Sequence, residues 1–387
     1  MVRCVNLKLR FPQTGAFASP SIPVYNLQSA AFHLTLPADT ATTVRKFSMN
    51  REDQLVERTV RKIPSVRSRN GARGTFGDVR IGIGDDSAIV APNGRTEWAL
   101  SCDSFIEGVH FLAKIHPPES VGYKSLVRSA SDLVAMGATP KYFLLALALP
   151  RLRTDSWLDR FARGMSRAAR YLGMRLIGGD TTNSKLISIG ITVLGEIARG
   201  RALTRSGAKP GDIVYVSGKL GRAQLGLDLI RSKFRRRREF QGLLRAHLYP
   251  KIRVQLGGWL AQNTIASAMM DISDGLSTDL SRLCAASGVG ARITAGTVPH
   301  VAIPASAADA LKMLLHDSLK MALDGGDDYE LLFTVPRRNL GRLRRAPGYS
   351  DLTAIGEITR TTQVNLVDDD GIASTLEARG WDSFRTK

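Results

Sequence analysis

The hydrophobic and polar positions between residues 50 and 200 switch repeatedly between two spacings. Short runs rich in apolar and β-branched residues indicate strands, and apolar residues three or four positions apart indicate amphipathic helices. The pattern predicts helices over 55–63, 123–136 and 157–172, an irregular segment over 104–111, and strands that end at Asp85-Asp86 or run over 97–102, 143–149, 175–180 and 186–196. Alternating strands and helices are typical of an α/β domain, which we assign to residues 49–200.

A second domain is expected over residues 201–387. Its pattern predicts a turn-rich start over 205–212, strands over 213–217 and from 268 to the turn at Asp271–Asp274, a helix over 276–287 and a strand-like run that begins near residue 330. Residues 1–48 contain one acidic residue, Asp39, and show no sustained periodicity. Such a segment cannot easily form a core, so we expect a disordered extension, a transit peptide or a coding start placed upstream of the true one at Met49.

Composition narrows the class of protein. With 387 residues, 43% of them hydrophobic, the chain can bury a large core. No window reaches the roughly 18 consecutive apolar residues that a membrane span requires, so we expect no membrane-spanning segment. The three cysteines, Cys4, Cys102 and Cys284, are odd in number and lack metal-ligand spacing. They suit free thiols in a reducing compartment, and we therefore expect a cytoplasmic protein.

The formal net charge of +19 permits two interpretations. Clustered Lys and Arg can neutralise the phosphates of a nucleic acid, and the densest run is K-F-R-R-R-R at 233–238. However, the excess charge is dispersed along the chain and no aromatic stacking pattern accompanies this run, so a solvated basic surface explains it better. Nucleic acid is not the expected partner.

Acidic residues recur where apolar runs meet Gly or Ser. They are Asp85-Asp86, Asp103 after Cys102, Asp132 after Ser131, Asp180 after two glycines, and Asp271 with Asp274. Carboxylates that converge repel one another and need a cation between them. Oxygen ligands without nearby Cys or His pairs favour Mg²⁺, which usually serves substrate phosphates. Because 218–221 lacks the Walker A spacing, the residues predict a magnesium-dependent, phosphate-handling enzyme without a P-loop.

Seven blocks, spread in order from residue 82 to residue 333, carry a family resemblance. They read G-I-G-D-D-S-A (82–88), S-C-D-S-F-I-E-G-V-H-F (101–111), S-D-L-V-A-M-G-A-T-P (131–140), L-I-G-G-D-T-T (176–182), R-A-L-T-R-S-G-A-K-P-G-D (201–212), D-I-S-D-G-L (271–276) and G-G-D-D-Y-E-L-L-F (325–333). This series resembles the thiamine-monophosphate kinase family of the aminoimidazole ribonucleotide synthetase superfamily. The resemblance implies a two-domain α/β (α+β) fold. Its N-terminal domain would bind ATP and Mg²⁺ and would form the interface of a homodimer through a mixed sheet with helices, and a C-terminal α/β domain would follow.

The resemblance also implies an activity and a set of site residues. The family transfers the γ-phosphoryl group of ATP directly to thiamine monophosphate, without a phosphoenzyme. Trp381 suits stacking against the cationic thiazolium or the aminopyrimidine. By position, the implied metal ligands are Asp86, Asp103, Asp132, Asp180, Asp271 and Asp274, supplemented by Ser101 and Cys102; the nucleotide contacts are Gly179, Asp180, Arg205 and Ser273; and the substrate contacts are His110, Asp327 and Trp381.

Three positions depart from the usual family pattern. Cys102 stands where Thr is common, and its thiol suits Mg²⁺ poorly. Asp327 replaces the usual Glu and shortens the side chain by one methylene, and Asn183 stands where Arg is frequent. We also expect the adjacent aspartates to differ, with Asp86 as the metal ligand and Asp85 shaping the turn or supporting the site from behind.

Two other classes of protein are alternatives to this interpretation. A selenophosphate synthetase would need a reactive Cys or selenocysteine with a Lys near the start of the domain, and a hydrogenase-maturation dehydratase would need a C-terminal Cys. Neither feature occurs here, since the chain ends in Phe384-Arg-Thr-Lys. A non-catalytic binder of thiamine phosphates or of polyanions is the alternative from a different functional class.

Overall fold

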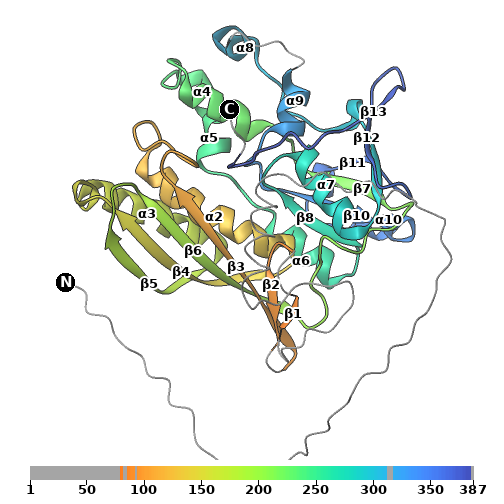
Figure 1. Ribbon diagram of the computed structural model, residues 1–387, viewed down its shortest axis with the longest axis horizontal. Helices are drawn as coiled ribbons and strands as arrows, with labels where there is room; N and C mark the ends of the chain where they lie inside the picture. Colours follow the sequence, from red (N-terminus) through yellow and green to blue (C-terminus); the bar gives the residue numbers. More distant parts are fainter. Residues whose placement is uncertain (1–78, 82–84, 92–93, 312–316, 385–387) are drawn as a thin grey trace, which may run out of the picture. The chain divides into compact units, whose positions relative to one another are not determined.

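The computed structural model describes residues 79–81, 85–91, 94–311 and 317–384 (Figure 1). The extension expected over 1–48, the helix expected over 55–63 and the segment 82–84 lie outside these residues. Both β-sheets of the described part belong to one compact unit, Phe47–Lys387. Among the described helices, none is long and apolar enough to cross a membrane.

The N-terminal sheet is mixed and has six described strands in the order β1-β2-β3-β6-β4-β5. Strands β4 and β5 run parallel, and the other neighbours are antiparallel. Helices α2 and α3 cover one face of this sheet (Figure 1). The bounds are β1 Val79–Ile81, β2 Ala88–Val90, β3 Thr96–Ile106, α2 Pro118–Ala135, β4 Thr139–Leu149, α3 Ser156–Leu172, β5 Arg175–Asn183 and β6 Ser188–Ala198, with a 3₁₀ turn at Arg151–Arg153.

The C-terminal sheet has seven described strands in the order β13-β12-β9-β11-β7-β10-β8. The strands are β7 Ile213–Ser217, β8 Ala268–Ile272, β9 Gly290–Thr294, β10 Glu330–Val335, β11 Leu352–Thr359, β12 Val364–Val367 and β13 Ala373–Thr375. The helices are α4 Arg222–Arg231, α5 Gln241–Leu248, α6 Val254–Gln262, α7 Leu276–Ser287, α8 Ala305–Leu311, α9 Asp317–Asp324 and α10 Leu340–Leu343, and 3₁₀ turns occur at Arg238–Phe240, Ala295–Thr297, Arg337–Asn339 and Tyr349–Asp351.

Helix α2 joins the two halves of the unit. It packs on β3, β4 and β6 on one side and contacts β8, α5 and α6 on the other (Figure 1). Strand β8 is the edge of its sheet, yet all its residues are buried, because α2 lies against it. One hydrophobic cluster therefore continues from Leu133 of α2 to Leu260 of α6 and Phe333 of β10. This packing brings the end of α2 next to Asp271 of β8.

Glycines allow α2 and α3 to approach closely. A Cβ atom added at Gly164 of α3 would lie 1.9 Å from the backbone oxygen of Glu119, and one added at Gly122 of α2 would lie 2.1 Å from that of Phe161. Both distances are far below van der Waals contact. The crossing of α2 over α3 thus depends on residues that have no side chain.

Most predicted elements are present, and their ends differ where strand pairing extends them. The strand over 213–217 and the helix over 276–287 match their expected bounds. The expected end of a strand at Cys102 is wrong, because β3 continues to pair with β6 as far as Ile106, opposite Ser188. Asp103 consequently lies inside β3. In the same way β5 runs past Asp180, because its parallel pairing with β4 continues to Asn183.

Candidate active site

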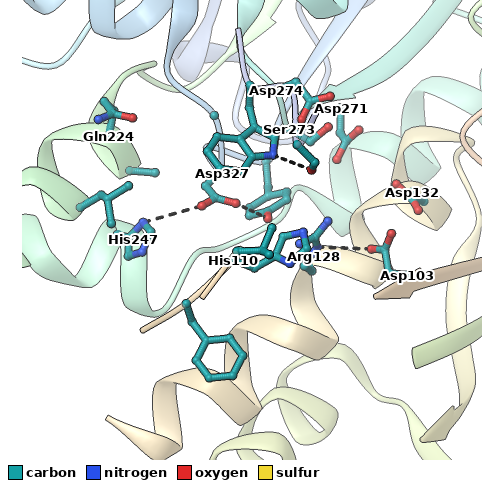
Figure 2. Close-up of a pocket in the computed structure, with 18 of the residues that line it drawn as sticks. Asp103, His110, Arg128, Asp132, Gln224, His247, Asp271, Ser273, Asp274 and Asp327 are labelled. Atoms are coloured by element: carbon teal, nitrogen blue, oxygen red, sulfur yellow. Dashed lines mark hydrogen bonds and ion pairs between the residues drawn. The ribbon is translucent and has the colours of Figure 1, made fainter. Parts of the chain in front are cut away.

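A cavity of about 360 Å³ lies between the two halves of the compact unit. Its lining brings together residues far apart in the sequence (Figure 2). The resemblance names fourteen different residues for metal, nucleotide and substrate, and ten of them line this cavity: Asp86, Asp103, His110, Asp132, Arg205, Asp271, Ser273, Asp274, Asp327 and Trp381. The cavity is therefore the candidate active site.

The other four, Ser101, Cys102, Gly179 and Asp180, are not among the residues that line the cavity. Ser101 still contacts the site through Asp132.

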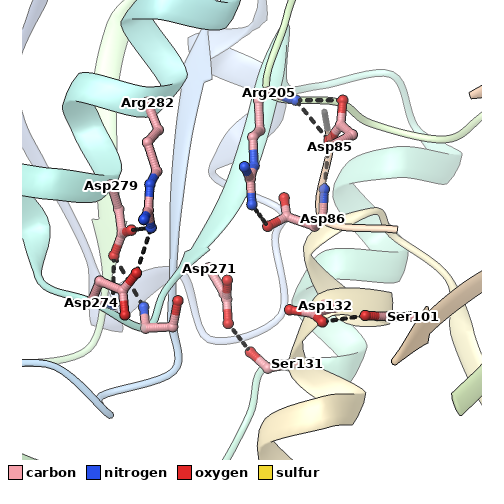
Figure 3. A network of polar contacts seen from close by, with 11 residues as sticks. Asp85, Asp86, Ser101, Ser131, Asp132, Arg205, Asp271, Asp274, Asp279 and Arg282 are labelled. Carbon is pink, nitrogen blue, oxygen red and sulfur yellow. Dashed lines mark hydrogen bonds and ion pairs between the residues drawn. The ribbon is translucent and has the colours of Figure 1, made fainter. Parts of the chain in front are cut away.

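Three carboxylates form a compact cluster at one end of the cavity. Asp86 precedes β2, Asp132 lies in the last turn of α2 and Asp271 lies in β8, and each offers an oxygen within 4.8 Å of the others. Two hydroxyl groups orient them (Figure 3). The Ser101 hydroxyl donates to Asp132 Oδ2 over 2.5 Å, and the Ser131 hydroxyl donates to Asp271 Oδ2 over 2.6 Å.

The charge of this cluster is poorly compensated. Burial raises the pKa of Asp132 well above its usual range, and Asp103 and Asp271 raise it further. Burial, followed by the charge of Asp86, raises the pKa of Asp271 to about 7. The buried Oδ2 of Asp86 has no hydrogen-bond partner within the described part of the chain. A divalent cation bound by oxygen ligands would satisfy this oxygen and relieve the repulsion, so the residues fit Mg²⁺.

Asp85 and Asp86 have different surroundings (Figure 3). Asp85 Oδ1 accepts hydrogen bonds from the backbone N–H groups of Asp86, over 3.0 Å, and Arg205, over 3.2 Å. Asp86 instead faces the cluster, and its Oδ1 accepts a hydrogen bond of 2.6 Å from Arg205 Nη2. Burial, and to a smaller extent the negative charge of Asp86, raises the pKa of Asp85 to about 7. Asp85 therefore holds the local backbone, while Asp86 presents a free oxygen to the cluster.

The loop with Ser273 and Asp274 is fixed by a residue that the sequence did not indicate. Asp279 of α7 turns back, and its Oδ2 accepts the backbone N–H groups of Ser273, Asp274 and Gly275 over 3.1, 3.0 and 3.1 Å. Arg282, one turn further along α7, pairs with both Asp274 and Asp279. An acidic residue in the first turn of a helix that follows Gly275 is the local signal for such an interaction.

The three expected substrate residues line the same cavity. His110 Nδ1 accepts the backbone N–H of Ile106 over 3.0 Å, and burial followed by the charge of Arg128 lowers the pKa of His110 to about 4. The backbone N–H of Trp381 donates to the backbone carbonyl of Asp274 over 2.8 Å, and Trp381 is 44% exposed. Asp327 has a left-handed backbone, with φ at 69°, a strained conformation for a residue with a side chain.

Asp327 is held by partners that the sequence did not single out (Figure 2). Its Oδ2 accepts a hydrogen bond of 2.7 Å from Lys124, and its Oδ1 accepts one of 2.6 Å from the Tyr329 hydroxyl. His247 Nδ1 lies 3.8 Å from Oδ2. Burial alone would raise the pKa of Asp327, but Lys124 and His247 outweigh it and hold this pKa well below its usual range. The carboxylate is therefore ionised and fixed in place.

The structure leaves three expected residues away from the cluster. Cys102 is exposed on β3, where side chains alternate between faces, and its thiol accepts a hydrogen bond of 3.3 Å from Thr192 Oγ1 rather than facing Asp132. Gly179 and Asp180 lie on β5, the edge strand of the N-terminal sheet, and every residue of that strand is exposed. The roles implied for these residues stay predictions.

Comparison with known proteins identifies the family. The chain matches the AIR synthase related protein models, the N-terminal domain over residues 84–197 and the C-terminal domain over 209–369. Thiamine-monophosphate kinase of Salmonella typhimurium is 40% identical over 316 residues, covering 80% of this chain and 93% of the relative. The Bacillus subtilis enzyme is 34% identical over 317 residues, covering 79% and 94%. The chain belongs to the thiamine-monophosphate kinase family.

Solved structures agree with this assignment. Thiamine monophosphate kinase from Aquifex aeolicus is similar to the chain with a TM-score of 0.67 and 30% identity, covering 84% of this chain and 99% of that one. AaThiL complexed with AMPPCP and TMP is similar with a TM-score of 0.69 and 30% identity, covering 87% and 99%. The family resemblance and the two-domain AIR synthase-like fold expected from the sequence are thereby confirmed. Hydrogenase maturation protein HypE, at 22% identity and a TM-score of 0.57, shares the fold alone.

Proposed function

We propose that this member of the thiamine-monophosphate kinase family transfers the γ-phosphoryl group of ATP to thiamine monophosphate, yielding thiamine diphosphate and ADP. The observation that carries the proposal is the largely buried cluster of Asp86, Asp132 and Asp271 in a cavity that is also lined by His110, Asp327 and Trp381. Relatives with this name, and a structure of one that holds AMPPCP and TMP, support the choice of both substrates.

Mg²⁺ is the proposed cofactor. Asp86, Asp132 and Asp271 would hold it, and Asp103 and Asp274 line the cavity close to them. When bound, Mg²⁺ neutralises phosphate oxygens and helps align the two reacting groups. The proposed ligands come from both 49–200 and 201–387, so we place ATP and Mg²⁺ between these two segments rather than within the first alone.

The chain's own residues would position the two substrates. Arg205, whose guanidinium is fixed by Asp86, is suited to bind phosphate oxygens of ATP, and Ser273, on the loop that Asp279 caps, lines the same cavity. On the acceptor side, the fixed carboxylate of Asp327 attracts the cationic thiazolium, and Trp381 offers an aromatic face for stacking. Neutral His110 can exchange hydrogen bonds with the substrate without adding charge.

Direct transfer needs alignment and charge neutralisation more than a protein nucleophile. His110 is held by the Ile106 backbone and Ser273 by its loop, and neither is paired with a base among the described residues. A phosphoenzyme would require such an activated pair. In-line attack by the acceptor phosphate on the γ-phosphoryl group is therefore the mechanism we favour.

A homodimer through the N-terminal sheet is part of the same proposal. The face of this sheet that α2 and α3 do not cover, together with edge strand β5, exposes Tyr142, Leu144, Leu176 and Ile177, at 37%, 37%, 53% and 55%. A second copy packed there would bury these side chains, and Asp180 would lie at or near the interface. Any role of Gly179 and Asp180 with nucleotide or metal would then depend on the dimer.

An assay of ADP release tests the function. Purified protein with Mg-ATP should release ADP when thiamine monophosphate is added, and mass spectrometry should detect thiamine diphosphate. Asp271→Asn should lower turnover by at least about 100-fold, because the cluster would lose a charged ligand. A protein that binds thiamine monophosphate or RNA but forms no thiamine diphosphate would be a binder, and the kinase proposal would be wrong.

A further inference from the structure

Arg128 is a cavity residue that the expected site does not include. It lies on α2 one turn before Asp132, and this spacing of four residues places both side chains on the same face of the helix. Its side chain lines the cavity and is 20% exposed. A cation is thus placed on the wall of the cavity close to the metal-binding carboxylates.

The guanidinium of Arg128 has unused hydrogen-bonding capacity. Its Nε lies 3.4 Å from Asp103 Oδ2, yet it is buried and makes no hydrogen bond to any residue that the structure describes. The guanidinium carbon lies 5.5 Å from the centre of the Phe105 ring, which supports its flat face. By contrast, Arg205 donates to Asp86 and Arg282 donates to Asp274. Arg128 therefore retains donors for a ligand.

Arg128 lies between the proposed metal ligands and the residues proposed to bind thiamine monophosphate. Asp103 and Asp132 lie on one side of it, and His110 and Asp327 lie on the other (Figure 2). In the proposed reaction, the phosphate of thiamine monophosphate would meet the γ-phosphoryl group beside the proposed metal ligands, and the organic part would extend toward His110 and Trp381. Two anionic groups must approach each other there, and a planar guanidinium can donate two parallel hydrogen bonds to phosphate.

We propose that Arg128 binds the phosphate of thiamine monophosphate through its free N–H groups and offsets the repulsion between the acceptor and donor phosphates. This inference rests on the proposed function and adds a specific acceptor-binding residue to it. The competing explanation is that Arg128 only neutralises Asp103, which would affect the metal site and ATP as much as the acceptor.

Calorimetric binding separates these explanations without requiring turnover. Arg128→Met keeps an unbranched apolar side chain beside Phe105 but removes the charge, so it should bind thiamine monophosphate roughly 10- to 100-fold more weakly, as expected for loss of charge-assisted hydrogen bonds. Its affinity for thiamine, which has no phosphate, should stay within about threefold. Arg128→Lys should recover part of the loss, because a point charge remains but the planar fork does not.

Steady-state kinetics give a second measurement. Arg128→Met should raise KM for thiamine monophosphate far more than KM for ATP, with little change in the Mg²⁺ concentration that gives half-maximal rate. The matched control is Arg163→Met, which removes a 65% exposed arginine of α3 outside the cavity and should leave all constants unchanged.

Each outcome bears on a different proposal. Unchanged binding of thiamine monophosphate by Arg128→Met, or an equal loss for thiamine and its phosphate, would overturn the role of Arg128. If the KM for ATP and the Mg²⁺ concentration that gives half-maximal rate rose as much as the KM for thiamine monophosphate, Arg128 would only neutralise Asp103. Wild-type protein that binds thiamine monophosphate without phosphorylating it would overturn the proposed function and leave the Arg128 binding test intact, whereas wild-type protein that does not bind it would overturn both.

Discussion

At the scale of single residues, the adjacent aspartates Asp85 and Asp86 have different interactions. Asp85 accepts backbone N–H groups of Asp86 and Arg205, whereas Asp86 carries a buried oxygen without a partner among the described residues. The first interaction supports the backbone, and the second leaves charge for a cation. The sequence indicated that the two aspartates would differ, and the hydrogen bonds supply the physical reason.

Exchanging each aspartate for its amide tests this difference. Asp86→Asn should lower ADP release by about 100-fold or more, because an amide is a weaker ligand for Mg²⁺ and cannot balance its charge. Asp85→Asn should cost less than about tenfold, because its amide oxygen can still accept a backbone N–H. Equal and mild effects of the two substitutions would contradict the assignment, provided that both variants keep the wild-type circular dichroism spectrum.

At the scale of elements, α2 determines how the site is assembled. It carries Arg128 and Asp132, which line the cavity, and the buried Lys124, which pairs with the cavity residue Asp327. It also contacts both the N-terminal sheet and β8. Its position is fixed from the opposite side by its close crossing with α3 at Gly164. A small displacement of α2 would therefore move several site residues together.

A glycine substitution at this crossing should reveal the effect. Gly164→Ala places a Cβ atom 1.9 Å from the Glu119 backbone oxygen, so we expect a loss of about 1–3 kcal/mol in the free energy of unfolding, measured with urea. Gly258→Ala in α6 is the matched control. No atom lies within 4 Å of its added Cβ, and the higher helix propensity of alanine should stabilise the protein by about 0.5–1 kcal/mol. Similar stabilities of the two variants would contradict the importance of the close crossing.

At the scale of the whole unit, a buried histidine pair links the halves. His116 Nε2 lies 3.1 Å from His247 Nε2 of α5, and Lys124 Nζ lies 3.3 Å from His247 Nδ1. Burial and then Lys124 lower the pKa of His116 from 6.5 to about 4, and the same causes lower that of His247 well below its usual range. Both rings are therefore neutral in the folded protein at pH 7.

This shift predicts loss of stability in acid. Between pH 6.5 and about 4, His116 binds a proton in the unfolded chain but not in the folded protein. The stability that is fully present above pH 6.5 is therefore lost as the pH falls toward 4. His116→Asn should reduce the pH dependence of the unfolding free energy by up to about 1.4 kcal/mol per pH unit in this window. The difference from wild type is the relevant quantity, because Asp132 and Asp271, whose pKa values are raised, act in the opposite direction. His300→Asn, an exposed substitution outside the pair, is the control; an unchanged slope in His116→Asn would contradict the prediction.

The sequence by itself determined the element types, the family and most of the cavity residues, because apolar periodicity and short Gly- and Asp-containing blocks are local properties of the chain. It did not reveal Lys124, Arg128, His247 or Asp279, since each acquires its role from a partner distant in sequence or from the fold of a loop. Tertiary structure also decided that Cys102 faces away from the carboxylates and that Asp180 lies on an exposed edge strand. Packing of α2 against β8 is the reason that the acidic residues of two separate sheets meet in one site.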